Sequence, residues 1–442
     1  MKLKRILKWV GVSIACLWGL AIFLIMLFGA AIQVLPYFLK PKVEAEIAAI
    51  KAKDEPVTQS ELAKPPIPDA ENGAVVYQKI FQAIDDHQTW DDLVLALSLL
   101  STQERRENPE LWNEAALAIG RLDHLIPMVE EAQSRRKCVF PVNWNEPPPS
   151  VKYPQFAYLR RLSGLLCASA MLSAREGNPD KALQSLTMSY GMISSIPDSP
   201  NLMFQLTRFE MALRPSSALR LIARQSHINE LQAKRLYDQL SGIDMSDDAY
   251  DAMVGERAMG ISCFEVMREN PYKAISQFSP PSQKPAIRRG PPSAAWQAMI
   301  YWDELFYLRT MRKWIAQSRL PYRKIRARHL DSEPEIPRYC LMSAILLPVF
   351  PRSAPKQDTA TAYIAGDQIL LALIAYKDRH GSYPVGLAEL RSKLGWKSWR
   401  HRYPRRPRSD SLLLCKRAWL YRQKPHRSLT SKSPPHHSLR RC

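Results

Sequence analysis

The sequence predicts a mainly α-helical protein with one N-terminal transmembrane helix, and three observations support this fold class. An uncharged apolar run stands near the N-terminus. Glycine is scarce, at 16 of 442 residues, while hydrophobic residues make up 46% of the chain, which favours packed helices over a β-sandwich. Most of the 35 prolines fall in clusters between segments with helical spacing, where they separate successive helices. We expect antiparallel helical hairpins, then a small C-terminal α+β element and a disordered tail.

The apolar run extends from Trp9 to Ile32 and holds 24 residues. As a helix it is about 36 Å long, enough to cross a hydrocarbon core of about 30 Å. Basic residues are more numerous before the run than after it, so the positive-inside rule predicts a cytoplasmic N-terminus and an extracytoplasmic main domain. Signal-peptide cleavage after residues 29–31 is the alternative, although secretory apolar cores are shorter, about 7–15 residues. The flanking basic residues are Lys2, Lys4, Arg5 and Lys8 before the run, and Lys40 and Lys42 after it.

Composition and spacing divide the chain into five segments. These are a cytoplasmic basic end with the anchor (1–39), a stalk and linker (40–68), a helical domain (69–350), a C-terminal element (354–396) and a basic tail (397–442). Of the net charge of +20, +13 lies in the tail, so the first 396 residues carry only +7. Because the domain is predicted to face outward, we expect no nucleic-acid partner.

Helix boundaries in the domain follow from capping residues and prolines. Asp69 is the expected N-cap of the first helix, and Asn108 followed by Pro109 is a strong start signal. Glycine and Asn-Pro at 177–179 predict a tight joint between two helices. The expected later elements are Trp90–Leu100, one long helix over Glu110–Ser134, an extended crossover over Arg135–Tyr153, hairpins over Pro154–Gln225, then Ile228–Leu240, Ser246–Glu269, Ser293–Gln317 and a buried segment Leu341–Phe350.

Gly177 to Leu183, with Pro197 closing the segment, resembles the second half of a tetratricopeptide repeat. The first half lacks the expected Trp, Leu-Gly and Tyr positions, and no second copy follows at a 34-residue step. The resemblance implies a solenoid-like helical domain rather than a true repeat array.

A basic run follows the aromatic-rich helix Ser293–Gln317. Two interpretations of the run stay open: a solvated loop, or contact with anionic lipid headgroups or cell-wall polymer. The aromatic residues of the helix likewise fit a core, or one face at a lipid interface. The residues predicted for lipid or polymer contact are Arg319, Arg323, Lys324, Arg326 and Arg328.

The C-terminal element contains Ala-Leu-Ile-Ala-Tyr-Lys-Asp-Arg-His-Gly-Ser-Tyr-Pro from Ala372 to Pro384. This string resembles the segment after the long helix in type II secretion pseudopilins, which implies a small sheet after it. The N-terminus lacks the processing site of that family, so the resemblance does not imply pilus assembly. The order of anchor, Pro68–Asn72, Arg136–Trp144, helical domain and Tyr-Pro element is also similar to large uncharacterised membrane-anchored bacterial proteins, which implies a fold and no activity.

Beyond the Tyr-Pro element the chain becomes rich in Arg, Pro, Ser and His. Two explanations stay open for 397–442: a reading-frame change near Gly395, or a genuine disordered basic tail. A Gly-rich strand pattern in another frame of the gene would establish the first.

No catalytic, cofactor-binding or metal-binding residues are predicted. The sequence lacks a phosphate-binding loop, HExxH, Gly-x-Ser-x-Gly and paired-cysteine spacing. Asp378 and His380 are close in sequence, but helix-end capping is expected of them rather than catalysis. We expect a membrane-bound, non-enzymatic scaffold of the cell envelope with an unknown protein partner. An envelope hydrolase with unrecognised acidic residues is the alternative, and a secretion-apparatus component is a weaker one.

Overall fold

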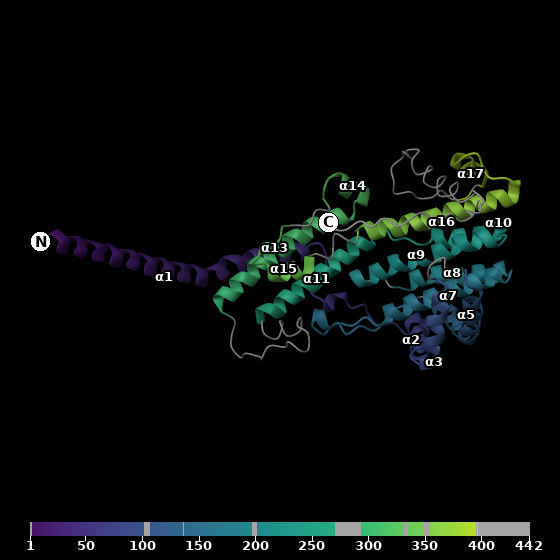
Figure 1. Ribbon diagram of the computed structural model, residues 1–442, viewed down its shortest axis with the longest axis horizontal. Coiled ribbons are helices and arrows are strands. Elements are labelled where there is room, and N and C mark those ends of the chain that lie inside the picture. The colour runs from purple at the N-terminus through teal and green to yellow at the C-terminus, as the bar shows by residue number, and fades with distance from the viewer. Residues whose placement is uncertain are drawn as a thin grey trace, which may run out of the picture. The chain divides into compact units, whose positions relative to one another are not determined.

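The computed structural model describes residues 2–100, 107–135, 137–196, 201–269, 293–330, 335–347, 354–394 and 396. Most of these residues are helical, and apart from one isolated β-bridge the described residues contain no strand, so the mainly α prediction is confirmed (Figure 1). The tail, with the sheet expected in it, lies outside the described residues.

The elements are α1 (Lys2–Lys51), η1 (Ser60–Leu62), η2 (Asp69–Glu71), α2 (Gly73–Ile84), α3 (His87–Ser98), α5 (Pro109–Leu122), α6 (Leu125–Ser134), η3 (Pro148–Ser150), α7 (Gln155–Arg175), α8 (Pro179–Ser195), α9 (Leu202–Gln225), α10 (Glu230–Ser241), α11 (Asp248–Glu269), α13 (Ala294–Ser318), α14 (Tyr322–Ala327), α15 (Leu341–Leu346), α16 (Ala354–His380) and α17 (Leu387–Leu394).

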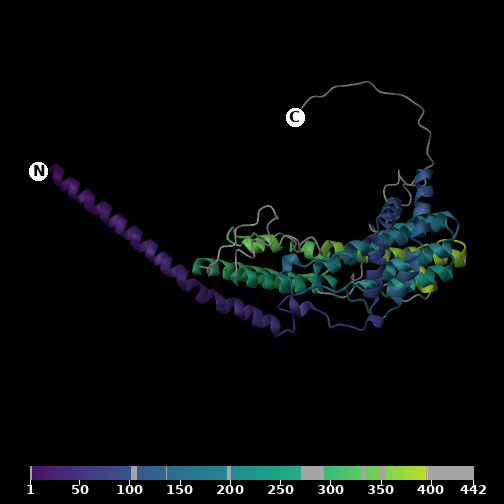
Figure 2. The ribbon, with the colours of Figure 1, turned by 90° about the horizontal axis from the view of Figure 1, so that it is seen from below.

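The N-terminal helix α1 is continuous from the apolar run through the expected stalk. Its direction changes near the middle, as Figures 1 and 2 show. Pro36 and Pro41 lie inside the helix, and each removes an amide donor and crowds the carbonyl four residues earlier. Proline is therefore the physical reason for this bend.

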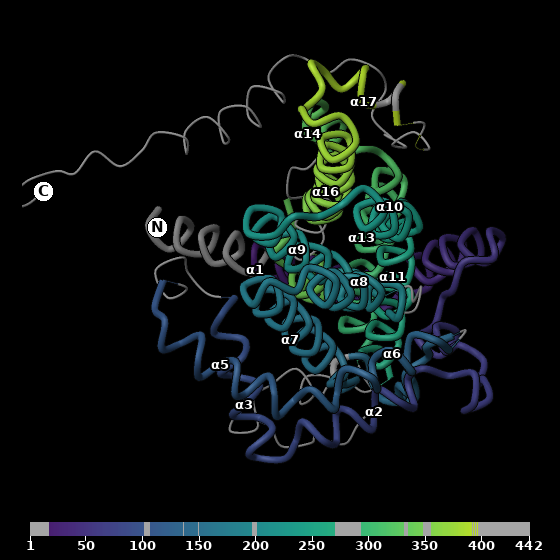
Figure 3. Tube along the Cα trace, turned by 90° about the vertical axis from the view of Figure 1, so that its right-hand side faces the viewer, coloured from purple at the N-terminus to yellow at the C-terminus, as the bar shows by residue number. Residues whose placement is uncertain are grey.

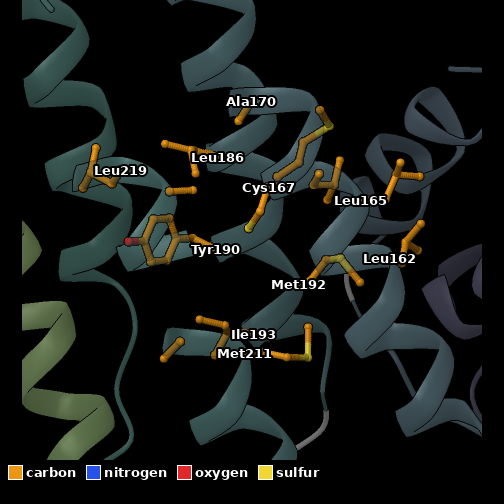
Figure 4. Packing of buried hydrophobic residues seen from close by; sticks show 14 of the residues in the cluster. Leu162, Leu165, Cys167, Ala170, Leu186, Tyr190, Met192, Ile193, Met211 and Leu219 are labelled. Carbon is orange, nitrogen blue, oxygen red and sulfur yellow. The ribbon is translucent and has the colours of Figure 1, made fainter. Parts of the chain in front are cut away.

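A first core joins α2, α3, α5 to α10, α16 and α17. Figure 3 shows α7, α8 and α9 beside one another, with α16 next to α9 and α10. Large apolar side chains such as Leu186 and Tyr190 fill the space between these helices (Figure 4). The predicted joint between α7 and α8 is confirmed: Gly177 has φ +77°, and the Asn178 side chain accepts a hydrogen bond from the amide of Lys181.

A second core joins the last third of α1 to α11, α13 and α15. Helices α11 and α13 are antiparallel, since Trp296 Nε1 donates to the Met267 carbonyl near one end. Further along, the Tyr307 hydroxyl donates to the Glu256 carbonyl over 2.9 Å. This core thus includes the end of the helix whose first part is the apolar run.

Three predicted helix boundaries are wrong. Helix α3 begins at His87, three residues before the expected Trp90, because the Asp86 side chain caps it. The expected single helix over Glu110–Ser134 is two helices, α5 and α6, with a break at Asp123 and His124. Pro127 explains the break, because its ring clashes with the carbonyl of residue 123 in a continuous helix. The N-cap of α2 is Asn72 rather than Asp69, which lies in η2.

The linker part of the expected stalk and linker (40–68) packs on the domain at its start. Glu55 accepts hydrogen bonds of 2.7 Å from both Tyr250 and Arg257 of α11. Gln59 is buried. Its backbone amide donates a hydrogen bond to Ser262 Oγ, and its side-chain amide donates to the carbonyls of Trp144 and Glu146. Helix α1 is thus connected to the rest of the domain by a segment with fixed contacts.

Candidate functional site

The first part of α1 presents an apolar surface to its surroundings. Ten large apolar side chains between Leu17 and Phe28 are 52–70% exposed. A helix this long and apolar is able to cross a membrane, and so large an exposed apolar surface is rare in a soluble protein. Helix α16 is also long and apolar enough to cross a membrane over Pro355–His380. However, Leu371 and Ala375 are fully buried in the first core, as in an ordinary core helix.

Further along, one face of α1 packs on α13. The buried residues on this face recur at steps of three or four, which is the spacing of one helix face. This spacing is the signal in the sequence that identifies the contact, which the prediction of a plain stalk over 40–68 missed. The face consists of Pro36, Leu39, Val43, Ile47 and Ile50.

Ion pairs set the register between α1 and α13. The Glu46 carboxylate lies 2.9 Å from Arg312 and 3.8 Å from Arg309. Just past the end of α1, Glu55 bonds to Tyr250, whose ring carries the guanidinium of Arg319 at 3.7 Å from the ring centroid. The later residues of α1 therefore meet the later residues of α13, and the two helices run parallel.

The predicted basic run lies at the far end of α13. Arg319 is held over the Tyr250 ring. Helix α14 buries only Ile325, while the other four predicted residues are exposed around it and form no ion pair with another described residue. Four residues of the run thus form one local cluster around α14, and Arg319 is held separately on Tyr250. The four exposed cations are Arg323, Lys324, Arg326 and Arg328.

A cavity of about 250 Å³ lies where the joint between α9 and α10 meets the end of α16. Asp378 lines it and accepts a 2.8 Å hydrogen bond from the amide of Glu230, the first residue of α10. Its other oxygen is 3.2 Å from Nε2 of His227. The expected capping role of Asp378 is therefore realised on a neighbouring helix, while the His380 ring packs on Tyr376 at 4.3 Å. The remaining lining residues are Ala223, Ser226, Ile228, Ile374, Lys377 and Tyr383.

Two adjacent buried acids on α13 have separate partners. Asp303 accepts hydrogen bonds from the amides of Met342 and Ser343 at 2.8 and 3.1 Å, which caps α15. Glu304 is fully buried and pairs with Arg268 of α11. Burial raises the pKa of both carboxyls, and that of Glu304 to about 7. Each acid is used to join helices.

Two further buried acids belong to other contacts. Burial raises the pKa of Glu256 to about 7, and Oε1 of this residue accepts the amide of Leu202 at the start of α9. Burial also raises the pKa of Asp367 to about 6. Neither these two acids nor the pair on α13 lines the cavity near His227. Paired carboxylates in one groove would favour a hydrolase, and these four carboxylates give that alternative no support.

Asp367 is the centre of a buried hydrogen-bond network, and its titration should make the stability of the protein depend on pH. The Tyr190 and Ser216 hydroxyls donate to its two oxygens at 2.7 and 2.8 Å. Because its pKa is raised to about 6 in the folded protein, the folded state binds this proton more tightly than the unfolded chain does. Its stabilising contribution is complete below about pH 4 and is lost as pH rises through 6.

Asp367→Asn removes this titration. We therefore expect the unfolding free energy of the variant to fall by about 2 kcal/mol less between pH 4 and 7 than that of wild type. Chemical denaturation across that pH range measures the slope. Asp91→Asn, an exposed position on α3, is the matched control and should leave the slope as in wild type. An unchanged slope in Asp367→Asn would contradict the prediction.

The string Ala372–Pro384 forms the end of α16 and a turn at Gly381 with φ +74°, and α17 follows it. The Tyr376 hydroxyl donates to Glu389 of α17 over 2.7 Å, which holds the turn closed. No protein-family model, curated protein or solved structure matches this chain.

Proposed function

We propose that this chain is a single-pass membrane protein of the cell envelope whose helical domain is a non-enzymatic scaffold for another protein. The domain is extracytoplasmic in this proposal, because Lys and Arg are more numerous before the apolar run than after it. The observation that carries the proposal is the continuity of α1, which is exposed and apolar from Leu17 to Phe28 and belongs to the core by Val43.

A continuous helix suits a scaffold because it fixes both the height and the orientation of the domain above the bilayer. A flexible tether would instead let a domain search the space around its anchor. Here the segment after α1 is also fixed, by the buried Arg257 on Glu55 and by Gln59. The helical surface is therefore presented to a partner at one position.

The basic run around α14 is a proposed second contact with an anionic polymer of the cell wall. Arg319 is 17 residues beyond Trp302, or about 25 Å along α13 at 1.5 Å per residue. Trp302 is level with the end of the exposed apolar surface of α1, because Glu46 of α1 pairs with Arg309 and Arg312 of the parallel helix α13. Charges are screened over about 8 Å at physiological ionic strength, so this distance favours a wall polymer over lipid headgroups.

Cross-linking in native membranes followed by purification and mass spectrometry tests the scaffold. One dominant protein partner is the expected result, and it should persist after extraction in several detergents. Recovery of the chain with no cross-linked protein would overturn the scaffold proposal and direct attention to substrates of a hydrolase.

A four-residue charge reversal tests the basic run. We expect Arg323→Glu, Lys324→Glu, Arg326→Glu and Arg328→Glu together to reduce binding to purified anionic wall polymer at least tenfold. The matched control reverses four exposed cations elsewhere and should retain binding. Equal loss in both variants would indicate a general charge effect and contradict a specific contact. The control positions are Lys79, Lys152, Arg224 and Arg235.

A further inference from the structure

Four large apolar side chains are exposed on α13, on α15 and in the segment that leads into α15. Their exposed fractions are 44% for Trp302, 47% for Tyr339, 50% for Leu341 and 53% for Ile345. The rings of Trp302 and Tyr339 meet edge to face with centroids 6.0 Å apart. We call these four residues the α13–α15 patch.

The patch is held in place by buried contacts beneath it. Asp303, the residue after Trp302, accepts the amides of Met342 and Ser343 and so fixes the start of α15 against α13. Leu341 and Ile345 are four residues apart and share one side of that helix. Met342 is buried on the other side. The expected buried segment Leu341–Phe350 is thus buried on one side only in its described part, residues 341–347.

The register of α1 on α13 gives the height of the patch. Glu46 pairs with Arg309 and Arg312, and both helices rise about 1.5 Å per residue in the same direction. Eight residues earlier, Phe38 of α1 is level with residues 301–304 of α13. The exposed apolar surface of α1 ends at this height, since Phe38 is 64% exposed and charged Lys40 follows.

We propose that the α13–α15 patch inserts into the interfacial layer of the same bilayer that α1 crosses. The inference rests on the proposed membrane anchoring and adds a second contact to it. Tryptophan and tyrosine concentrate at the headgroup level of membranes, where an apolar ring and a polar group are both satisfied. Leu341 and Ile345 supply the aliphatic surface that enters the acyl boundary. A lipid occupant is favoured because the patch continues, at the same height, the apolar surface that α1 presents.

Photo-cross-linking of the full chain in membranes tests the proposal. The photoreactive residue p-benzoylphenylalanine is placed at one position at a time, and labelled phospholipid is the probe. The test position is Ile345→p-benzoylphenylalanine. Phe28→p-benzoylphenylalanine reports on the anchor itself. The matched control is Leu231→p-benzoylphenylalanine, because Leu231 is 60% exposed on α10 of the first core.

The proposal expects lipid adducts at 28 and 345, with the yield at 345 at least fivefold above that at 231. Adducts at 28 but only background at 345 would overturn this inference while the anchoring stands. Background at all three positions would overturn the anchoring and this inference with it. Adducts at 345 to a protein, or to another segment of the chain, would also overturn a lipid contact.

A second variant separates insertion from mere proximity. With the probe at Ile345, Trp302→Ser and Leu341→Gln together should lower the lipid yield at least threefold, since they remove the aromatic and aliphatic parts of the patch. Leu117→Gln, which alters a residue that is 67% exposed on α5, should leave the yield unchanged. An undiminished yield in the patch variant would contradict insertion.

Discussion

Replacing Val43 and Ile50 by aspartate is expected to release the end of α1 from the domain and to lower the unfolding free energy by about 3–6 kcal/mol. Both side chains are nearly fully buried in the second core, and burying each contributes about 1.5–3 kcal/mol. The new carboxylates would have no partner there, so the helix separates rather than burying them.

Hydrogen exchange of the protein in nanodiscs measures this release. Amides of α11, α13 and α15 should exchange faster in the Val43→Asp and Ile50→Asp variant, while those of α7 and α8 in the first core stay protected. Ala45→Asp and Ala49→Asp place the same charges on the exposed side of α1 and should leave exchange unchanged. If both double variants behaved alike, the packed stalk would not be part of the second core.

At pH 8, removing Arg268 is expected to cost about 3–5 kcal/mol of unfolding free energy, because it leaves the buried Glu304 without its partner. Glu304 is fully buried and Arg268 is partly exposed. The guanidinium lies also near the Tyr301 ring, 5.4 Å from its centroid. Arg268→Met keeps much of the side-chain volume and removes the charge, so it isolates the electrostatic loss.

A double-mutant cycle distinguishes a lost pair from lost packing. Arg268→Met combined with Glu304→Leu should recover most of the stability, since no charge is then left buried. The penalty of Arg268→Met alone should also be smaller at pH 5 than at pH 8. The pKa of Glu304 is already raised to about 7 and loss of Arg268 raises it further, so the buried acid is neutral at pH 5. A penalty that is independent of pH would contradict this explanation.

Local signals in the sequence were sufficient for many helix boundaries. Asn108 with Pro109 starts α5, and the Asn178 side chain caps α8, as expected from their chemistry. The predictions failed where a local signal competed with another: Pro127 divided a periodic apolar pattern, and Asn72 displaced Asp69 as the cap because its side chain also bonds to the backbone of Val139.

The candidate sites show the same division. The basic run could be identified from composition, since three of its five cations fall on one short element, α14, and Arg328 follows directly after it. Its distance from the apolar part of α1 could not be identified in this way, because that distance depends on which end of α13 meets α1. The α13–α15 patch was hidden in the same way: Leu341 and Ile345 are ordinary apolar residues in the sequence, and they are exposed only because Met342 takes the side of α15 that faces the core.

By itself, the sequence determined the apolar N-terminal helix, the helical class and most helix ends, because these depend on the properties of residues within a few positions of one another. Tertiary structure alone decided how those helices are joined. Glu46 meets Arg312, Glu55 meets Arg257, and Tyr190 meets Asp367, which lies 177 residues away. Such partners are chosen by the packing of whole helix faces, so the position of the domain on α1 is a property of the fold and not of any segment.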